Sequence, residues 1–354
     1  MNAPVVRVAV VDDSAFMRIA LRQMLSRIEG VVLVAEGRNG KEAVEIAASH
    51  APDLMTLDVL MPEMNGIAAL EKIMAEHPCP VIMISTETLD GAETTMRALD
   101  LGAVDFIAKT TDMARLDMAA IEHNLAEKVR YWSRQDRRSL RRAKPVERLL
   151  SRAAVAPDGI PEIVVVAAST GGPRAVTELV CALREVRCPI VVVQHMPAGF
   201  TADFARHLAV RSGKDVVEAA GELVLAPGQV VVMPGGINSE IVRDDTGRLV
   251  VKPSHDTSGA VHPNADIAMA SVAAQAGRAV GVVLTGMGDD GSRGAGCFAQ
   301  RNWPVLVQDP ASCVVAGMPQ AVIASGAASE VLTLAAMARR LNGWLALEQA
   351  GERP

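Results

Sequence analysis

The sequence predicts an α/β protein made of two doubly wound parallel-sheet domains. The chain has 354 residues, and single hydrophobic cores rarely grow beyond roughly 250–300 residues. Short β-branched runs alternate with helical patterns along two separate stretches, and a strongly basic segment lies between them. We therefore expect domains at residues 1–127 and 161–350, joined by a basic linker at 128–160.

The first domain is expected to consist of five βα units. Helical patterns cover Ser14–Arg27 and Gly40–Ser49, between apolar runs typical of buried strands. The expected strands are Val5–Val11, Val31–Glu36, Leu54–Asp58, Val81–Ser85 and Asp105–Ile107. Five units of this length predict a parallel sheet of the flavodoxin type, with ligands at the carboxyl ends of its strands.

The second domain repeats this alternation. Its clearest expected strands are Ile163–Ala168, Ile190–Val193, Val230–Val232, Ala279–Leu284 and Val305–Val307. The linker before it is rich in lysine and arginine and ends in the stretch Pro157–Pro161. A basic run can bind nucleic acid or lipid, but few aromatic residues interleave with the charge, so a solvated helix and tether is the better interpretation.

Composition excludes several classes of protein. The net charge of −6 gives no general attraction to nucleic acid or anionic membranes, and aromatic residues make up only 3% of the chain. No apolar run reaches the length of about 18 residues that a membrane helix needs, so we expect no membrane insertion. The five cysteines are scattered and lack metal-type spacing, which indicates a reducing, cytoplasmic compartment.

Acidic residues gather at one predicted edge of the first sheet. Asp12 and Asp13 follow the first strand and Asp58 ends the third, while Ser85 ends the fourth and Lys109 follows the fifth. Converging carboxylates repel one another without a cation, and Mg²⁺ prefers such hard oxygen ligands. A lysine and a hydroxyl nearby suit phosphoryl oxygens. Alternatively, Asp12 and Asp13 only cap the helix that follows them.

The motifs VVDDS, LDVLMPEMNG, MIST and DFIAK resemble those of response-regulator receiver domains across nearly the whole first domain. The resemblance implies that Asp58 accepts a phosphoryl group, that Ser85 is the switch hydroxyl, and that Lys109 senses the phosphate. The family usually has proline after this lysine, where this chain has Thr110. The Mg²⁺ ligands implied by the resemblance are Asp12, Asp13, Asp58 and the Leu60 carbonyl.

A serine, a histidine and an aspartate follow strands of the second domain. Ser169 precedes a Gly-Gly turn, His195 follows a second strand, and Asp290 follows a third. If these strands are parallel, their carboxyl ends share one edge, which predicts a nucleophile, a base and an orienting carboxylate. The backbone N–H groups near Thr170 and Met287 are candidate oxyanion donors.

Other interpretations compete with this triad. His207, His255 and His262 are rival bases, and adjacent Asp289 is a rival acid that the residues alone cannot separate from Asp290. The stretch from Gly286 to Gly291 also matches the dinucleotide pattern G-x-G-x-x-G. That match lies late in its domain and would set aspartates beside a pyrophosphate, which argues against a dinucleotide site.

The motifs AASTGG, VQHMPAGFTADFARHL, MPGG and LTGMGDDG resemble the catalytic domain of the chemotaxis protein-glutamate methylesterase family, over roughly residues 161–345. The resemblance implies a Rossmann-like domain, the triad Ser169, His195 and Asp290, and no cofactor for the esterase. One departure is His262, where the family commonly has arginine. Arginine pairs bidentately with carboxylates and histidine does not, so one interpretation is a different substrate affinity or preference, and the other is that this position only shapes a loop.

The resemblance implies a carboxylic-ester hydrolase that removes methyl esters from glutamates of chemotaxis receptors, releases methanol, and deamidates receptor glutamines. A chemotaxis-type histidine kinase would phosphorylate Asp58 and relieve a block by the receiver. Two alternatives are a response regulator with a non-catalytic interaction module and one with a DNA-binding output. The strand-rich second domain argues against the latter, which requires a helix-turn-helix.

Overall fold

The structure is a computed structural model that describes residues 5–86, 89–109, 118–134, 148–149, 159–259 and 261–346. The chain divides into two units, Met1–Arg142 and Ala143–Pro354, and each is described by itself. The last helix of the first unit, α5 (Met118–Arg134), continues past residue 127 into the segment expected to be a linker. The domain limits 1–127, 128–160 and 161–350 remain a prediction.

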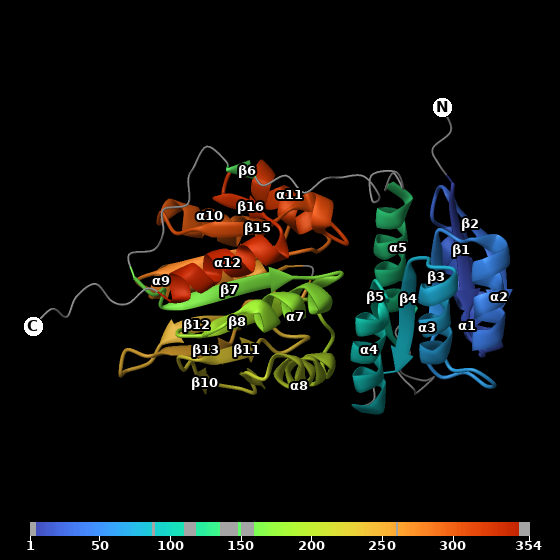
Figure 1. The fold of residues 1–354 in the computed structure, drawn as a ribbon, viewed down its shortest axis with the longest axis horizontal. Helices are drawn as coiled ribbons and strands as arrows, with labels where there is room; N and C mark the ends of the chain where they lie inside the picture. Colours follow the sequence, from blue (N-terminus) through green and yellow to red (C-terminus); the bar gives the residue numbers. More distant parts are fainter. Residues whose placement is uncertain are drawn as a thin grey trace, which may run out of the picture. The chain divides into compact units, whose positions relative to one another are not determined.

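The first unit is a five-stranded parallel sheet in the order β2-β1-β3-β4-β5. This is the strand order of flavodoxin-like folds, as predicted. Helices α1 and α5 contact each other, as do the neighbouring helices α2, α3 and α4 (Figure 1). The remaining elements are β1 (Val6–Val11), α1 (Ala15–Ser26), β2 (Val31–Gly37), α2 (Gly40–His50), β3 (Leu54–Asp58), α3 (Gly66–Glu76), β4 (Val81–Thr86), α4 (Leu89–Leu101) and β5 (Asp105–Lys109).

The order of this sheet reverses between β1 and β3, the two strands that end next to Asp12 and at Asp58. Every residue of β3 is buried, because a parallel sheet is covered by helices on both faces. The crevice beyond a reversal point is where such sheets bind ligands. The fold therefore puts the acidic residues in its ligand crevice.

The second unit is built on an eight-stranded sheet in the order β6-β16-β15-β14-β7-β8-β11-β9. All neighbouring pairs are parallel except β6 with β16. The sheet strands are β6 (Arg148–Leu149), β7 (Ile163–Ala168), β8 (Ile190–Gln194), β9 (Asp215–Glu218), β11 (Gln229–Val232), β14 (Ala279–Val283), β15 (Val305–Gln308) and β16 (Glu330–Leu332). The expected parallel arrangement of β7, β8 and β14 is confirmed.

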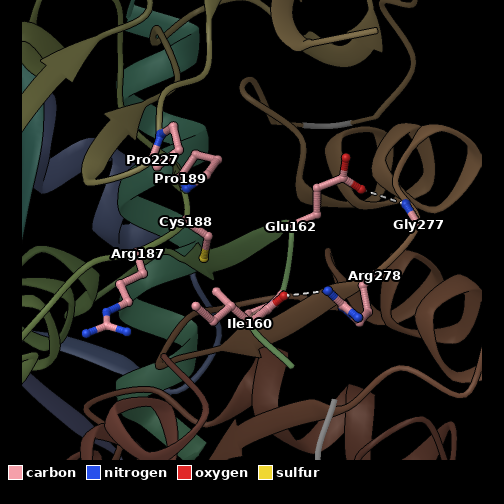
Figure 2. A pocket seen from close by; sticks show the side chains of 9 residues that line it. Ile160, Glu162, Arg187, Cys188, Pro189, Pro227, Gly277 and Arg278 are labelled. Atoms are coloured by element: carbon pink, nitrogen blue, oxygen red, sulfur yellow. Dashed lines mark hydrogen bonds between the residues drawn. The ribbon is translucent and has the colours of Figure 1, made fainter. Parts of the chain in front are cut away.

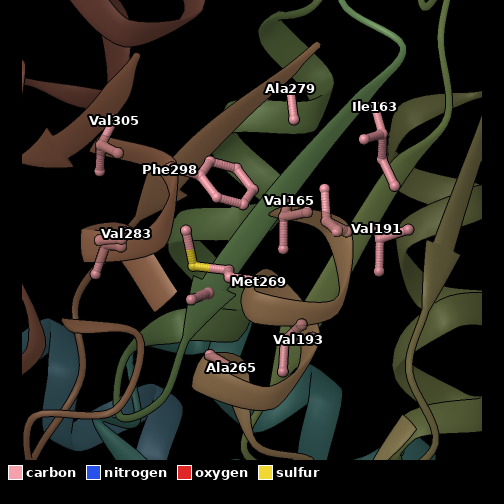
Figure 3. Close-up of a cluster of buried hydrophobic side chains, with 14 of the residues drawn as sticks. Ile163, Val165, Val191, Val193, Ala265, Met269, Ala279, Val283, Phe298 and Val305 are labelled. Carbon is pink, nitrogen blue, oxygen red and sulfur yellow. The ribbon is translucent and has the colours of Figure 1, made fainter. Parts of the chain in front are cut away.

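Alternating residues of β7 face opposite sides of this sheet. Ile163, Val165 and Ala167 lie in a core cluster with Met269 and Phe298 (Figure 3). Helices α9, α10 and α11 cover that face, while α7, α8 and α12 form the other layer (Figure 1). The helices are α7 (Gly172–Ala182), α8 (Phe200–Ser212), α9 (Ala265–Gln275), α10 (Ser292–Gln300), α11 (Gly317–Ala324) and α12 (Leu334–Leu345), with a 3₁₀ turn η2 (Pro310–Ser312).

A small antiparallel sheet, β10-β13-β12, adds to the parallel sheet that the sequence predicted. Its strands are β10 (Leu223–Val224), β12 (Ser239–Arg243) and β13 (Leu249–Pro253). Its apolar residues Ile241 and Val251 join the same core cluster as α9. In the turn between β12 and β13, the Asp244 carboxylate accepts hydrogen bonds from the N–H groups of Thr246 and Arg248, both at 2.9 Å.

Within the described residues, none of the helices is long and apolar enough to cross a membrane.

Candidate active site and phosphoryl pocket

Ser169 is the first residue after β7, and its backbone is tied to both neighbouring strands. The register pairs Ala168 with Gln194, so Ser169 and His195 occupy equivalent positions beyond adjacent strands, which lie about 4.8 Å apart. The His195 N–H donates to the Ala168 carbonyl at 3.0 Å, and the Ser169 N–H donates to the Thr285 carbonyl at 3.0 Å. The sheet therefore places the two residues side by side, and within the described residues no hydrogen bond joins the Ser169 hydroxyl to the His195 ring.

Two glycines let the chain turn sharply after Ser169. Gly171 has φ +74° and caps the N-terminus of α7, a conformation that other residues adopt only with strain. A Cβ on Gly172 would lie 2.2 Å from the Gln194 Oε1. Gly171 is therefore needed for the turn, and Gly172 for the close approach of this loop to β8.

His195 and Asp290 form a direct pair. The His195 Nε2 lies 2.7 Å from the Asp290 Oδ2, and both side chains are about nine-tenths buried, with exposures of 10% and 9%. The Asp290 carboxylate also accepts the N–H groups of Ala265 at 2.7 Å and of Asp266 and Gly291 at 2.9 Å. Burial opposes ionisation, but the hydrogen bonds from His195 and from these amides outweigh it and lower the pKa of Asp290.

The neighbouring acid and the rival histidines are placed differently. Asp289 and His255 are exposed, and the His262 Nδ1 lies 3.0 Å from the Asn238 Oδ1 in a separate loop. His207 lies on α8. Of the histidines considered, His195 is the one whose side chain pairs with Asp290.

One oxyanion candidate, Thr170, directly follows Ser169, and the other, Met287, follows Gly286, where an added Cβ would lie 2.9 Å from the Ser169 Cβ. The Thr170 carbonyl accepts a hydrogen bond from the Thr285 Oγ1 at 2.9 Å, which fixes the nucleophile loop on its β14 side. No residue in the described part of the chain accepts a hydrogen bond from the Met287 N–H. Its role as an oxyanion donor stays a prediction.

Sequence reasoning missed two buried polar side chains at this site. The Gln194 Nε2 donates to the carbonyls of Ser169 at 3.0 Å and His195 at 3.1 Å. The Thr285 Oγ1 bonds with the backbone of Thr170 and also of Val315. The available signal was a polar residue that ends a β-branched run, in IVVVQ and in AVGVVLT.

The acidic pocket of the first unit brings together Asp12, Asp13, Asp58 and Lys109. The Lys109 Nζ lies 2.8 Å from the Asp58 Oδ2 and 3.3 Å from the Asp12 Oδ2. The Val59 N–H donates to the other Asp58 oxygen at 2.8 Å. Burial raises the pKa of Asp58 to about 6, with Asp12 adding to the rise and Lys109 opposing it. Burial also raises the pKa of Asp12.

These three aspartates fit a divalent cation. Each offers one carboxylate oxygen, and the three oxygens lie within 4.8 Å of one another. Hard oxygen ligands at this spacing suit Mg²⁺. Leu60 follows Asp58 in the chain and its side chain is exposed, but its carbonyl as a ligand stays a prediction. The side chain of Ser85 and all of Thr110 lie outside the described residues.

A shallow cavity of about 570 Å³ lies at the opposite rim of the second unit, where β7, β8 and β14 begin (Figure 2). Glu162 there accepts the Gly277 N–H, and Arg278 donates to the Ile160 carbonyl. The cavity is therefore separate from the rim that carries Ser169.

A receiver-type acidic crevice in one α/β unit and a serine, histidine and aspartate at the rim of another define a response regulator with a hydrolase-type output domain. Residues 164–341 match the family model described as CheB methylesterase, and residues 8–121 match the response regulator receiver domain. The chain therefore belongs to the CheB methylesterase family and carries a receiver domain.

The sequence is similar to those of curated relatives over nearly the full length of the chain. The chain is 39% identical to protein-glutamate methylesterase/protein-glutamine glutaminase 1 of Oleidesulfovibrio alaskensis, covering 95% of this chain and 98% of that protein. It is 40% identical to the protein of the same name from Caulobacter vibrioides, and the match covers 95% of this chain and 97% of that protein. The Thermotoga maritima CheB methylesterase catalytic domain is 34% identical, covers 52% of this chain and 98% of its own, and gives a TM-score of 0.49.

Proposed function

We propose that this chain is a phosphorylation-regulated protein-glutamate methylesterase and protein-glutamine glutaminase that acts on chemotaxis receptors. The observation that carries the proposal is the buried His195–Asp290 pair, at 2.7 Å, next to a serine that directly follows the adjacent strand. The names of the curated relatives supply the substrate.

In the proposed mechanism, the Ser169 Oγ attacks the ester carbonyl carbon and its proton passes to His195. Because the His195 Nε2 is engaged by Asp290, the proton acceptor is the Nδ1. The carboxylate keeps this tautomer and stabilises the imidazolium that forms. The Met287 N–H and the N–H groups near Thr170 would stabilise the oxyanion, each contributing about 10²–10³ in rate.

The tetrahedral intermediate collapses when the C–O bond to the methoxy group breaks. His195 returns the proton to the leaving oxygen, so methanol departs and an acyl-serine remains. A water then attacks the acyl carbon with His195 as base, which regenerates Ser169 and leaves a glutamate carboxylate. A glutamine substrate follows the same path with ammonia as the leaving group, so one site performs both reactions.

The receiver is proposed to control this activity through Asp58. A chemotaxis-type histidine kinase would donate the phosphoryl group, forming an acyl phosphate as the P–N bond breaks and an Asp58 O–P bond forms. Asp12, Asp13, Asp58 and the Leu60 carbonyl would hold Mg²⁺, which when bound neutralises charge on the phosphoryl oxygens. Lys109, whose Nζ lies 2.8 Å from the Asp58 Oδ2, would pair with those oxygens, and Ser85 is the proposed switch hydroxyl.

The proposed location is the cytoplasm, and the five cysteines Cys79, Cys181, Cys188, Cys297 and Cys313 are all free thiols, in keeping with a reducing compartment.

The experiment that tests the function is methanol release from methylated receptor, with and without a small acyl phosphate and Mg²⁺. We expect release by the wild type, an increase with the phosphodonor, and loss of that increase in Asp58→Asn. Labelling by a fluorophosphonate should modify Ser169 and disappear in Ser169→Ala and His195→Ala. An unlabelled wild type that releases no methanol would instead favour a non-catalytic interaction module.

A further inference from the structure

Gln194 is a buried amide that touches the backbone of two residues of the proposed triad. It is the last residue of β8 and is 1% exposed. Its Nε2 donates to the carbonyl oxygen of Ser169 at 3.0 Å and to that of His195 at 3.1 Å. Both hydrogens of one amide group are therefore used to join the nucleophile loop to the base loop.

The orientation of this amide follows from its surroundings. Two carbonyl oxygens face the Nε2, and a carbonyl oxygen in its place would repel both of them. The Gln194 Oε1 is consequently turned toward the loop at Gly172, where it is buried and has no hydrogen-bond partner among the described residues. A buried acceptor without a partner lowers stability, so stability alone does not explain this side chain.

The Ser169 carbonyl is held from a second direction as well. The Gly172 N–H donates to it at 2.7 Å, so this oxygen accepts two hydrogen bonds. The absence of a side chain on Gly172 is what leaves room for the Gln194 Oε1. The Ser169–Gly172 turn and the Gln194 side chain thus fit each other, and together they fix the backbone position of Ser169.

We propose that Gln194 is a positioning residue that sets the separation of the Ser169 hydroxyl from the His195 imidazole. The inference rests on the proposed function and extends it to a residue that does not touch the substrate. Nucleophile and base react efficiently only within a narrow range of separation, and a displacement of 1 Å costs about 10²-fold in rate. Loss of the two donors removes one hydrogen bond from each loop at once, while the backbone bonds of Ser169 and His195 remain.

Gln308 provides a control that reaches the nucleophile loop only indirectly, through Thr285. It is also 1% exposed, ends the parallel strand β15, and bonds to backbone through both ends of its amide. Its Nε2 donates to the Ser312 carbonyl at 3.1 Å and its Oε1 accepts the Thr285 N–H at 2.8 Å, with no bond to the three triad residues. A methionine at either position keeps the side-chain length and removes the hydrogen bonds.

The test compares Gln194→Met, Gln308→Met and wild type as full-length proteins, with methylated receptor, acetyl phosphate and Mg²⁺. For Gln194→Met, we expect kcat to fall between about tenfold and a hundredfold and KM to change less than about twofold. Gln308→Met should lower the melting temperature about as much as Gln194→Met does, but keep kcat within about threefold of the wild type. Equal losses of kcat in the two variants would overturn the inference.

A second variant, Gln194→Glu, gives a readout that a merely structural role does not predict, and serves if Gln194→Met fails to fold. An ionised glutamate there has no donor and repels the two carbonyls, but a protonated one donates a hydrogen bond. The kcat ratio of this variant to wild type should therefore rise as pH falls. A ratio independent of pH would count against the proposal. A wild type without methanol release would instead refute the proposed function itself.

Discussion

Replacing Asp290 by asparagine tests whether its charge and acceptor geometry support catalysis. The introduced side-chain amide keeps the most hydrogen bonds when its oxygen faces the N–H groups of Asp266 and Gly291. Its NH₂ group then faces Ala265 and His195. The Ala265 N–H then loses its buried acceptor, which costs about 1–3 kcal/mol of stability. The NH₂ group also donates to the His195 Nε2, which places the imidazole proton on Nδ1 and blocks it as a base. A tautomer change of this kind lowers kcat about 10⁴-fold.

The assay is methanol release together with denaturant unfolding, and Asp289→Asn is the control. Asp289 is exposed, so its variant should stay within about 0.5 kcal/mol of wild-type stability and keep its activity. Activity of Asp290→Asn within tenfold of wild type, or an equal loss in the control, would refute the reasoning.

The pH dependence of stability gives an independent check on the same residue. Folding lowers the pKa of Asp290 from its ordinary value of 3.8, so its carboxylate stabilises the folded state above that pH. This contribution is lost as pH falls through the lower pKa of the folded state. The difference in unfolding free energy between wild type and Asp290→Asn should therefore narrow below about pH 3.8.

The remaining predictions concern backbone clearance and the acidic crevice. Gly66→Ala should destabilise the first unit by about 1–3 kcal/mol and abolish phosphorylation, because its Cβ would lie 2.0 Å from the Asp58 carbonyl oxygen. Gly343→Ala, where no atom lies within 4 Å, should instead stabilise by about 0.5–1 kcal/mol, and chemical denaturation measures both. Mg²⁺ should stabilise the first unit by about 2.7 kcal/mol at a concentration a hundredfold above its Kd, which is measured as a rise in melting temperature. Asp13→Asn should reduce this rise, and an undiminished rise would exclude Asp13 as a ligand. Lys109→Met should cost about 3–5 kcal/mol without Mg²⁺, since it leaves buried carboxylates without their cation, and adding Asp58→Asn should restore part of the loss.

The parallel cores were predictable from sequence because their strands are uninterrupted β-branched runs. Leu54–Asp58 and Ile163–Ala168 are strands over the same residues as expected. The antiparallel strands were not predicted, and two of them, β10 and β6, have only two residues each and give no periodic signal. Pairing with β13 and β16 defines them, and such pairing depends on residues far away in the chain.

The candidate site was predictable to the level of strand ends. Ser169, His195 and Asp290 were expected at one rim because parallel strands share a direction. The hydrogen bond to His195 separates Asp290 from Asp289, and it depends on how the loop meets α9, which the residues alone do not reveal. The role proposed for Gln194 likewise depends on two carbonyl oxygens that only the folded backbone brings together.

The central position of β7 has a consequence for the growing polypeptide. Strand β8 follows it closely in the chain and pairs with one edge, but the partner for the other edge, β14, is synthesised much later. Until then the edge of Ile163–Ala168 is bare and apolar, and such edges associate with other chains. During translation this edge therefore needs shielding, and the proposed triad is incomplete until Asp290 has left the ribosome.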